Sequence, residues 1–311
     1  MRITSNTPTC RLTDSTSSSA QCTGTRTISN AGDATAIASC KTWSGDIVIA
    51  TGASDDIALD GVQRIQGSLT VKNVDQVSSL SGDSLSQIDD TFTLENVQIL
   101  STLNFPSLTA VDVIDWTGLP NLQGLSLTAG LQLASTVSIQ NTALFSLEGI
   151  NVQSVDTLVV ASNVFLKTFS MQVESVSTSL LIEANGETTD IDFPNLVWAY
   201  NMTFQNCSTI NVVSLIAVNG SAGFSSNYFN KFQTPVLSSV GGTLSFHDNP
   251  QLSSMAMLAV ENIGGGLQIM NNEKFTLIYG FENLASVGGN IDIEGPFTRC
   301  VALGYFCTRK C

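Results

Sequence analysis

The only histidine in this chain of 311 residues is His247. A Ser–His or Cys–His nucleophile, or a histidine-rich metal site, would therefore depend on that single side chain. Catalysis without histidine is possible, because two carboxylates held about 5 to 10 Å apart can hydrolyse glycosidic bonds. The first question is therefore whether the fold brings any two acidic side chains together.

A short alternating pattern in the sequence predicts the strands and therefore where these acids lie. An aliphatic residue, any residue and a second aliphatic residue recur, followed by Asn or Gly. The second aliphatic residue falls at positions 49, 71, 94, 113, 139, 160, 182, 204, 224, 246, 269 and 293. The period of about 22 is typical of leucine-rich repeats, and the alternation indicates one short strand per unit with one buried face. We predict an all-β fold, a right-handed parallel β-solenoid of about twelve coils.

Stacked coils place their outward side chains in columns about 4.8 Å apart. If Val111-Asp112-Val113 is the strand of the fourth unit, Glu95 and Asp112 are the only outward acids on neighbouring coils. Asp292 and Glu294 share the last strand. We interpret all four as solvated side chains, and we predict no catalytic residue.

The remaining acidic residues and His247 are also expected to be solvated. Three acidic pairs flank strands in turns, where Asp is favoured because it bonds the local backbone: Asp55-Asp56, Asp89-Asp90, and Asp190 with Asp192. A calcium site needs six or more converging oxygens, which this spacing does not indicate. His247 is expected to face outward beside Asp248. We predict no metal and no cofactor.

Seven cysteines gather near the two ends of the chain, with one between them. They are Cys10, Cys22, Cys40, Cys207, Cys300, Cys307 and Cys311. No CxxC motif occurs, so a zinc or thioredoxin-type site is weakly supported. Terminal cysteines suit disulfides that seal the ends of a solenoid in an oxidising compartment. Because the number is odd, at least one thiol is free or paired between chains.

Three Asn-X-Ser/Thr sequons predict N-linked glycans on Asn201, Asn206 and Asn219 if the chain is secreted. Met202 should point inward, so Asn201 should face outward. Asn219 should lie on the rim of the strand. Asn206 follows the strand at the position where Asn recurs, so its side chain is expected to be buried.

Composition excludes several partners. Lys and Arg total 12 against 26 Asp and Glu, which gives a net charge of −14. Such a chain repels phosphate backbones and anionic lipid surfaces, so we predict no nucleic-acid partner. No run approaches 18 consecutive apolar residues, so no segment is expected to span a bilayer.

Two further elements recur between the strands. Phe-Pro-Ser/Asn-Leu segments, such as Phe105 to Leu108 and Phe193 to Leu196, should mark corners whose Phe and Leu point inward. Asparagine follows the strand in nine units, where we predict one buried ladder that bonds the next coil. The nine are Asn73, Asn96, Asn141, Asn163, Asn185, Asn206, Asn227, Asn249 and Asn272.

The chain divides into three parts. Residues 1–21 are polar and expected to be poorly ordered. Residues 22–294 form the solenoid, with an N-terminal cap at 22–45 and a short capping helix within residues 26–40. Residues 295–311 form an atypical Cys-rich tail in which the repeat is lost.

Several segments together resemble the fungal GPI-anchored cell-wall organisation proteins, the sporulation-specific and extracellular-mutant glycoproteins. They are Cys22 to Ile49, Gly67-Ser-Leu-Thr-Val71, Phe105-Pro-Ser-Leu108, Trp116-Thr-Gly-Leu-Pro120, Phe193 to Ala199 and Gly264 to Ile269. The resemblance covers roughly residues 22–294. It implies coils like those of receptor L-domains, a disulfide between Cys22 and Cys40, N-glycosylation, and a place at the outer face of the plasma membrane or in the cell wall.

The two ends depart from that family pattern. Residues 1–8 lack the apolar core of a signal peptide, and residues 299–311 lack a Ser/Thr-rich stalk and a hydrophobic GPI tail. We therefore expect membrane attachment only through a GPI anchor that this chain does not contain.

The resemblance implies a non-enzymatic glycoprotein that supports fungal cell-wall organisation and integrity, with wall polysaccharide or wall proteins as partners. One alternative is a receptor-like module that recognises a glycan or peptide on the exposed sheet. A second is a polysaccharide-active enzyme of β-helix type, which the scattered acids disfavour.

Overall fold

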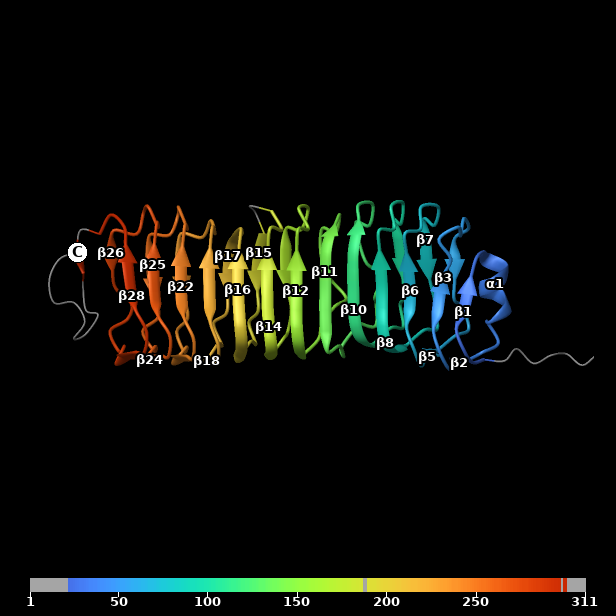
Figure 1. Cartoon of the computed structure of the whole chain (residues 1–311), viewed down its shortest axis with the longest axis horizontal. Helices are drawn as coiled ribbons and strands as arrows, with labels where there is room; N and C mark the ends of the chain where they lie inside the picture. The colour runs from blue at the N-terminus through green and yellow to red at the C-terminus, as the bar shows by residue number, and fades with distance from the viewer. Residues whose placement is uncertain (1–21, 187–188, 298, 301–311) are drawn as a thin grey trace, which may run out of the picture.

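A computed structural model describes residues 22–186, 189–297 and 299–300 of the chain. It is a solenoid of parallel strands that runs in chain order from one end of the molecule to the other (Figure 1). The predicted all-β solenoid of about twelve coils is confirmed. Cys10, Cys307 and Cys311, the segment 1–21 and most of the Cys-rich tail lie outside the described residues.

The front of the solenoid is a 19-stranded sheet, in which each strand pairs in parallel with the strand one coil later. Its main strands are β1 (Arg26–Ile28), β3 (Ile47–Ile49), β6 (Leu69–Lys72), β8 (Gln87–Glu95), β10 (Ala110–Leu119), β11 (Thr136–Thr142), β12 (Ser154–Ala161), β14 (Ser175–Glu183), β16 (Trp198–Gln205), β19 (Ala222–Ser225), β22 (Leu244–His247), β25 (Leu267–Met270) and β28 (Ile291–Glu294). Their inward residues alternate with outward ones, as the sequence pattern predicts.

Shorter strands precede the main strands at both ends of the same sheet. They are β2 (Thr42–Trp43), β5 (Arg64–Ile65), β18 (Ala217–Val218), β21 (Ser239–Val240), β24 (Asn262–Ile263) and β27 (Ser286–Val287). In the middle coils, the first halves of the long strands β8, β10, β12, β14 and β16 take their place, often with a bulge.

Glycine makes the corner between the short and main strands in the last coils. A Cβ on Gly241 would lie 2.1 Å from the carbonyl oxygen of Asn219, and one on Gly264 would lie 2.2 Å from that of Gly241. Because no side chain tolerates such an approach, these coils can stack at this corner only where the residue has no Cβ.

Four small parallel sheets form the back. Their strands are β4 (Ile57–Ala58), β7 (Ser79–Ser81) and β9 (Thr102–Asn104); β13 (Thr168–Ser170), β15 (Thr189–Asp192) and β17 (Cys207–Asn211); β20 (Lys231–Gln233) and β23 (Ser254–Ala256); and β26 (Leu277–Ile278) with β29 (Arg299–Cys300). The pairing of β29 with β26 carries the stacking to residue 300, inside the segment assigned to the tail.

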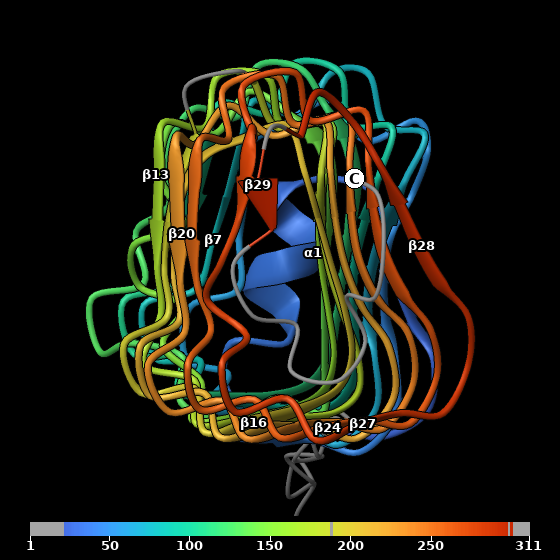
Figure 2. The same ribbon diagram turned by 90° about the vertical axis from the view of Figure 1, so that its left-hand side faces the viewer.

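The core runs the length of the solenoid between these sheets. Phe204, Phe224 and Phe246 stack on successive coils, with ring centroids 5.7 Å and 4.7 Å apart. Seen end-on, the coils enclose the core, and the helix α1 (Ala31–Ala36) lies across its far end (Figure 2). The helix therefore shields the first coil, as a terminal cap must do in a repeat protein.

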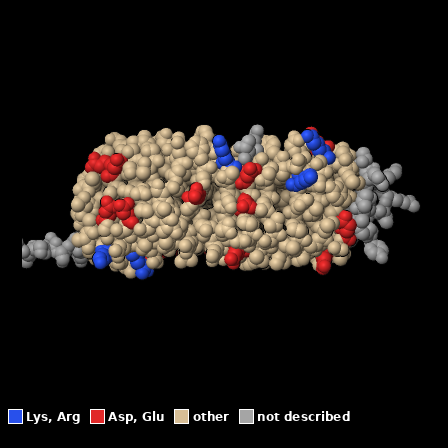
Figure 3. All heavy atoms as spheres, turned by 180° about the vertical axis from the view of Figure 1, so that it is seen from behind, with Lys and Arg blue, Asp and Glu red and all other residues tan. Residues whose placement is uncertain are grey.

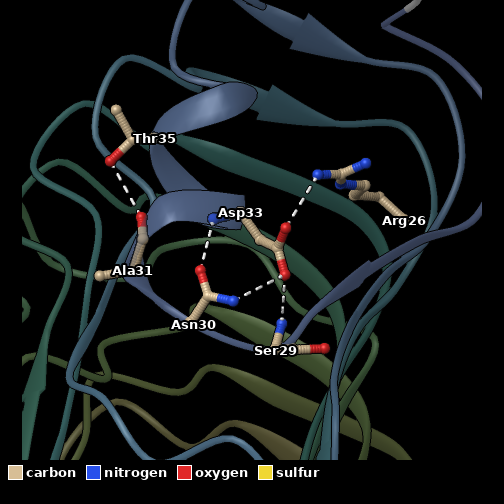
Figure 4. A network of polar contacts seen from close by, with 6 residues as sticks. All are labelled: Arg26, Ser29, Asn30, Ala31, Asp33 and Thr35. Carbon is tan, nitrogen blue, oxygen red and sulfur yellow. Dashed lines mark hydrogen bonds and ion pairs between the residues drawn. The ribbon is translucent and has the colours of Figure 1, made fainter.

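The capping helix α1 lies within the predicted range 26–40 and occupies only part of it. Residues 26–28 form β1, and the helix begins only after Asn30, whose side chain accepts a bond from the Asp33 N–H (3.0 Å). Asp33 in turn accepts from the Ser29 N–H at 2.9 Å and from Arg26 at 3.4 Å (Figure 4). This reciprocal capping satisfies free N–H groups of the first turn. A disulfide joins Cys22 to Cys40, with 5.6 Å between their Cα atoms.

The predicted strand of the fourth unit was wrong. The pairing with β8 places Ile114, Asp115 and Trp116 where the pattern predicted residues 111–113. The inward residue is Trp116, which packs edge-on against Phe92 with centroids 5.5 Å apart. The pattern was misplaced because Val111 and Val113, earlier in the same long strand, also alternate, whereas the second inward residue is a tryptophan.

Candidate functional site

The outward strip of the main strands is the first candidate surface. Its first column pairs Thr93 with Asp115, Asp115 with Ser138, and so on along the sheet. Most of its residues are uncharged and half-buried: Thr70, Ser138, Val159, Leu181, Thr203, Gly223 and Ser245, whereas Thr93 is buried. The strip is therefore flat and offers hydroxyl groups rather than charge.

The structure does not bring Glu95 and Asp112 together in one column. Glu95 neighbours Thr117 and forms an ion pair with Lys72 at 2.9 Å. Asp112 lies in the first half of β10, at the register shift against β8, and lines a cleft of about 410 Å³. The outward acid of this coil is Asp115, diagonal to Glu95. In the described residues, no group of three or more His, Cys, Asp or Glu side chains could hold a metal ion.

His247 is half-buried on the outward strip, and its Nε2 lies 3.3 Å from Oε1 of Gln268 on the next coil. Asp292 and Glu294 are exposed on β28. These three side chains lie on the last coils of the solenoid, several coils away from Glu95. They form no cluster with it.

Of the three acidic pairs, only Asp55-Asp56 lies in a turn; Asp89-Asp90 lie within β8, and Asp190 and Asp192 within β15, so the prediction of turns was wrong for these two pairs. Members of all three pairs bond between coils. Arg64 holds Asp89 with a contact of 2.7 Å, and the hydrogen bond to Asp89 raises the pKa of the Arg64 guanidinium above its ordinary value. Asp56 accepts from the Ser78 hydroxyl at 2.7 Å. Asp190 accepts likewise from Thr209 at 2.7 Å.

The nine asparagines occupy two positions, so the prediction of one buried ladder was wrong for four of them. Asn73, Asn96, Asn141 and Asn206 have φ near +50 to +60°, and none of them is buried. We call this the turn position. The next residue along the chain is the inner position, which is buried and held by Asn in five coils: Asn163, Asn185, Asn227, Asn249 and Asn272.

The inner asparagines form hydrogen-bonded ladders. The Asn249 side chain accepts from the N–H of Asn227 (2.9 Å) and donates to the carbonyl of Phe224 (3.0 Å). It also donates to Oδ1 of Asn272 at 3.0 Å. Each amide therefore satisfies backbone groups of the preceding coil and bonds the next ladder member.

Cys207 holds the inner position between the two runs of ladder asparagines. Its thiol is free and buried, its N–H donates to Oδ1 of Asn227 at 2.9 Å, and burial raises the pKa of the thiol to about 12. A thiol so far from ionisation is a poor nucleophile. We assign it to packing.

The three sequons lie on two adjacent coils. Asn201 is exposed on β16 beside the register shift against β14, and its Oδ1 accepts from the N–H of Ser221 at 2.9 Å. Asn219 is exposed on the following coil. Asn206 is half-buried rather than buried, because it holds the turn position with φ of 60°. All three predicted acceptors are therefore at least partly accessible.

The sequence pattern did not reveal a break in the back of the solenoid. Residues 146–149 form no strand, and they flank one cleft of about 480 Å³ beside Leu125 to Gly130 and another of about 230 Å³ beside Thr168 and Ser170. Nearby, the rings of Phe145 and Phe165 are exposed and meet edge-on at 5.9 Å. Figure 3 shows this back face as largely uncharged, with scattered acidic and basic side chains.

None of the helices in the described part of the chain has the length and apolar character needed to cross a membrane. No protein-family model matches the chain, and no solved structure matches it significantly. Known proteins do resemble it over most of its length.

Three relatives illustrate this similarity. The chain is 34% identical over 277 residues to a "Cell surface GPI-anchored protein" of Arthroderma benhamiae, covering 89% of this chain and 71% of the relative. It is 36% identical over 246 residues to "Protein ecm33" of Aspergillus fumigatus, covering 79% and 62%. It is 31% identical over 275 residues to "Sporulation-specific protein 2" of Saccharomyces cerevisiae, covering 88% and 55%.

The chain thus spans little more than half the length of some of these relatives. The similarity nevertheless extends over nearly the whole solenoid, as the resemblance of the individual segments predicted. The chain belongs to the fungal family of GPI-anchored cell-surface, Ecm33 and sporulation-specific proteins.

Proposed function

We propose that this chain is the repeat domain of a secreted glycoprotein that supports cell-wall organisation and integrity at the outer face of the plasma membrane or in the wall. The observation that carries the proposal is the 34% identity, over 89% of the chain, to a protein named for its GPI-anchored place at the cell surface. Another relative, 33% identical, is named a cell wall mannoprotein. Attachment through a GPI anchor is part of the proposal.

The physical character of the surface supports a non-enzymatic role. A net charge of −14 keeps the protein away from anionic partners. The outward strip offers Ser, Thr and Gln side chains along many coils, which suits repeated weak hydrogen bonds to a neutral wall polysaccharide or to a wall protein. Such contacts organise neighbouring polymers without chemical turnover.

Deleting the gene tests this proposal. We expect the deletion strain to become hypersensitive to dyes that bind wall polymers, and reintroduction of the gene to restore resistance. An epitope-tagged copy should be found in the wall or plasma-membrane fraction. Normal wall resistance together with an intracellular tag would overturn the proposal.

A receptor-like binding module is the second candidate, favoured by the flat strip of half-exposed hydroxyl side chains. A glycan array probed with the soluble solenoid separates the two. Saturable binding to one glycan, lost in the variant Ser245→Arg on the outward strip, would favour recognition. Weak binding spread over many wall polymers would favour the organising role.

The enzyme alternative depends on Glu95 and Asp115, the diagonal acidic pair on neighbouring coils. We expect no hydrolysis of wall glucans by the purified protein. Turnover that is lost in both Glu95→Gln and Asp115→Asn, with folding unchanged, would revive this alternative.

A further inference from the structure

Three large apolar side chains are exposed beside two of the sequons. Val197 is 38% exposed, and Tyr200 and Ile216 are each 48% exposed. Such side chains, when they cluster on a surface, usually mark a place that another group covers. We call Val197, Tyr200 and Ile216 the sequon patch.

Backbone hydrogen bonds fix the neighbours within the sequon patch. The N–H of Ile216 donates to the carbonyl of Val197 at 2.7 Å, so Ile216 lies beside Val197 on the next coil. The N–H of Gly220 donates to the carbonyl of Tyr200 at 2.6 Å. Asn219, the residue before Gly220, therefore lies beside Tyr200, and this pair is three residues along each coil from Val197 and Ile216.

The coils on either side carry polar or small residues at the same places. The N–H of Val197 donates to the carbonyl of Glu174 (2.8 Å), and the N–H of Ser238 donates to that of Ile216 (2.9 Å). Beyond Asn219 comes Gly241, whose missing side chain leaves that flank open. Along these columns, the exposed apolar residues are thus confined to the two coils that carry the glycan acceptors.

The acceptor amides can carry glycans without losing their contacts. The transfer joins C1 of a lipid-linked pyrophosphate oligosaccharide to Nδ2, breaks the bond between C1 and the pyrophosphate oxygen, and releases one Nδ2 proton. Oδ1 is unchanged, so the bond of 2.9 Å from the Ser221 N–H to Asn201 Oδ1 survives. That bond also holds the Asn201 amide in one orientation.

We propose that the inner sugars of the N-linked glycan on Asn219, flanked by the glycan on Asn201, fold over the sequon patch and shield it from water. The C–H face of a sugar ring packs on the Tyr200 ring, and Ile216 and Val197 extend the apolar surface. The inference rests on the proposed function, because these glycans are added only to a chain that enters the secretory pathway.

Asn206 provides an internal control. It directly follows β16, in which Asn201 lies, and is half-buried at the turn position. The neighbouring turn residues are Ala184 and Ser226. A glycan on Asn206 should therefore be solvated and leave the thermal stability almost unchanged.

The test uses the full chain secreted from a eukaryotic host behind an added signal sequence, with glycopeptide mass spectrometry for occupancy. We expect enzymatic deglycosylation to lower Tm by about 2 °C or more. The variant Asn219→Gln should lose most of that difference, whereas Asn206→Gln should keep it. In Tyr200→Ser, deglycosylation should change Tm much less than in the wild type.

Two results would overturn the inference: an unoccupied Asn219 beside an occupied Asn206, or an equal deglycosylation effect in Tyr200→Ser and in the wild type. The proposed function fails separately, if protein purified from its own fungus carries no glycan at any sequon. Because the host experiment forces secretion, it tests the sequon patch in either case.

Discussion

In the coils that contain β6 and β8, the inner position is held by Val74 and Val97, whereas Asn227, Asn249 and Asn272 hold it in later coils. The preceding turn position has φ near +50 to +60° in both regions, so the backbone path is the same. What differs between the two regions is the kind of side chain that fills the inner position. The early coils pack apolar side chains there, and the later coils build a ladder of amides.

In the early coils the asparagine side chains lie outside the core, at the turn position. Asn96 donates to Asn73 at 3.1 Å from the exposed turn position. A residue at the turn position must tolerate a left-handed backbone, which Asn does well. Asparagine at the inner position instead has to satisfy buried backbone groups. Asparagine therefore has a different role at each of these two adjacent positions.

The largest expected effect comes from exchanging Val and Asn at the inner position of the two regions. Asn249→Val places the residue of the early coils in the ladder and removes the side-chain partner of the Asn227 N–H and of the Phe224 carbonyl. Asn272 loses one bond but keeps the backbone N–H of residue 249 and the Phe246 carbonyl as partners. At about 1 to 3 kcal/mol for each unsatisfied buried group, we expect a loss of roughly 3 to 5 kcal/mol in the free energy of unfolding. Urea unfolding followed by circular dichroism measures it.

The reciprocal variant, Val97→Asn, is the matched control. Its amide would lie between Val74 and Leu119, which offer no amide to continue a ladder. Only backbone groups of the preceding coil could then partner it, so the variant should also destabilise, by about 1 kcal/mol. If either exchange were neutral, the distinction between a packed column and a bonded column would be wrong.

Alkaline pH should lower the free energy of unfolding through Cys207, which lies between the two asparagine ladders. The pKa of this buried thiol is about 12 in the folded chain against 9.0 for an ordinary thiol, because burial disfavours the thiolate. The Cys207 thiol therefore makes its full contribution to stability below pH 9. This contribution is lost as the pH rises towards 12, because the thiol of the unfolded chain releases its proton at a lower pH than the buried thiol does. The slope is about 1.4 kcal/mol per pH unit.

Unfolding curves at pH 8 and 10 for the wild type and Cys207→Ala isolate this contribution from the other groups that titrate there. We expect the alkaline loss to be smaller in the variant. Equal losses in both proteins would show that the Cys207 thiol does not contribute.

The smallest expected effect is a gain. Cys207→Asn should join the two ladders, because the new amide could accept from Asn185 and donate to the Ile182 carbonyl as its neighbours do. One or two added bonds give about 1 kcal/mol of stability and a rise in Tm of about 2 °C. Calorimetry against Cys207→Ala measures the gain, and an unchanged or lower Tm would mean that the two ladders cannot be joined.

Much of this fold could be predicted from the sequence, because a period of about 22 with alternating apolar residues leaves few alternatives. The predicted register was wrong at Trp116, because Val111 and Val113 offered the same alternation three residues earlier in the strand. The split of the asparagines was visible as spacing: Asn96 follows Leu94 by two residues, whereas Asn249 follows Phe246 by three.

The surface sites were harder to predict. The clefts beside residues 146–149 arise where a strand is missing, and a missing strand leaves no periodic signal. The sequon patch combines residues from two coils, so it depends on the register between Tyr200 and Asn219 that only the structure supplies.

The cap has a consequence for the kinetics of folding. Cys22 and Cys40 are 18 residues apart, so their disulfide closes a loop of nearly one coil. Forming the first coil is the step with the least support, because it has no neighbour to stack on. A covalent loop removes part of that entropic barrier. Later coils then need to close only loops of similar length onto an existing edge, so nucleation at the cap and elongation away from it can follow the order of synthesis.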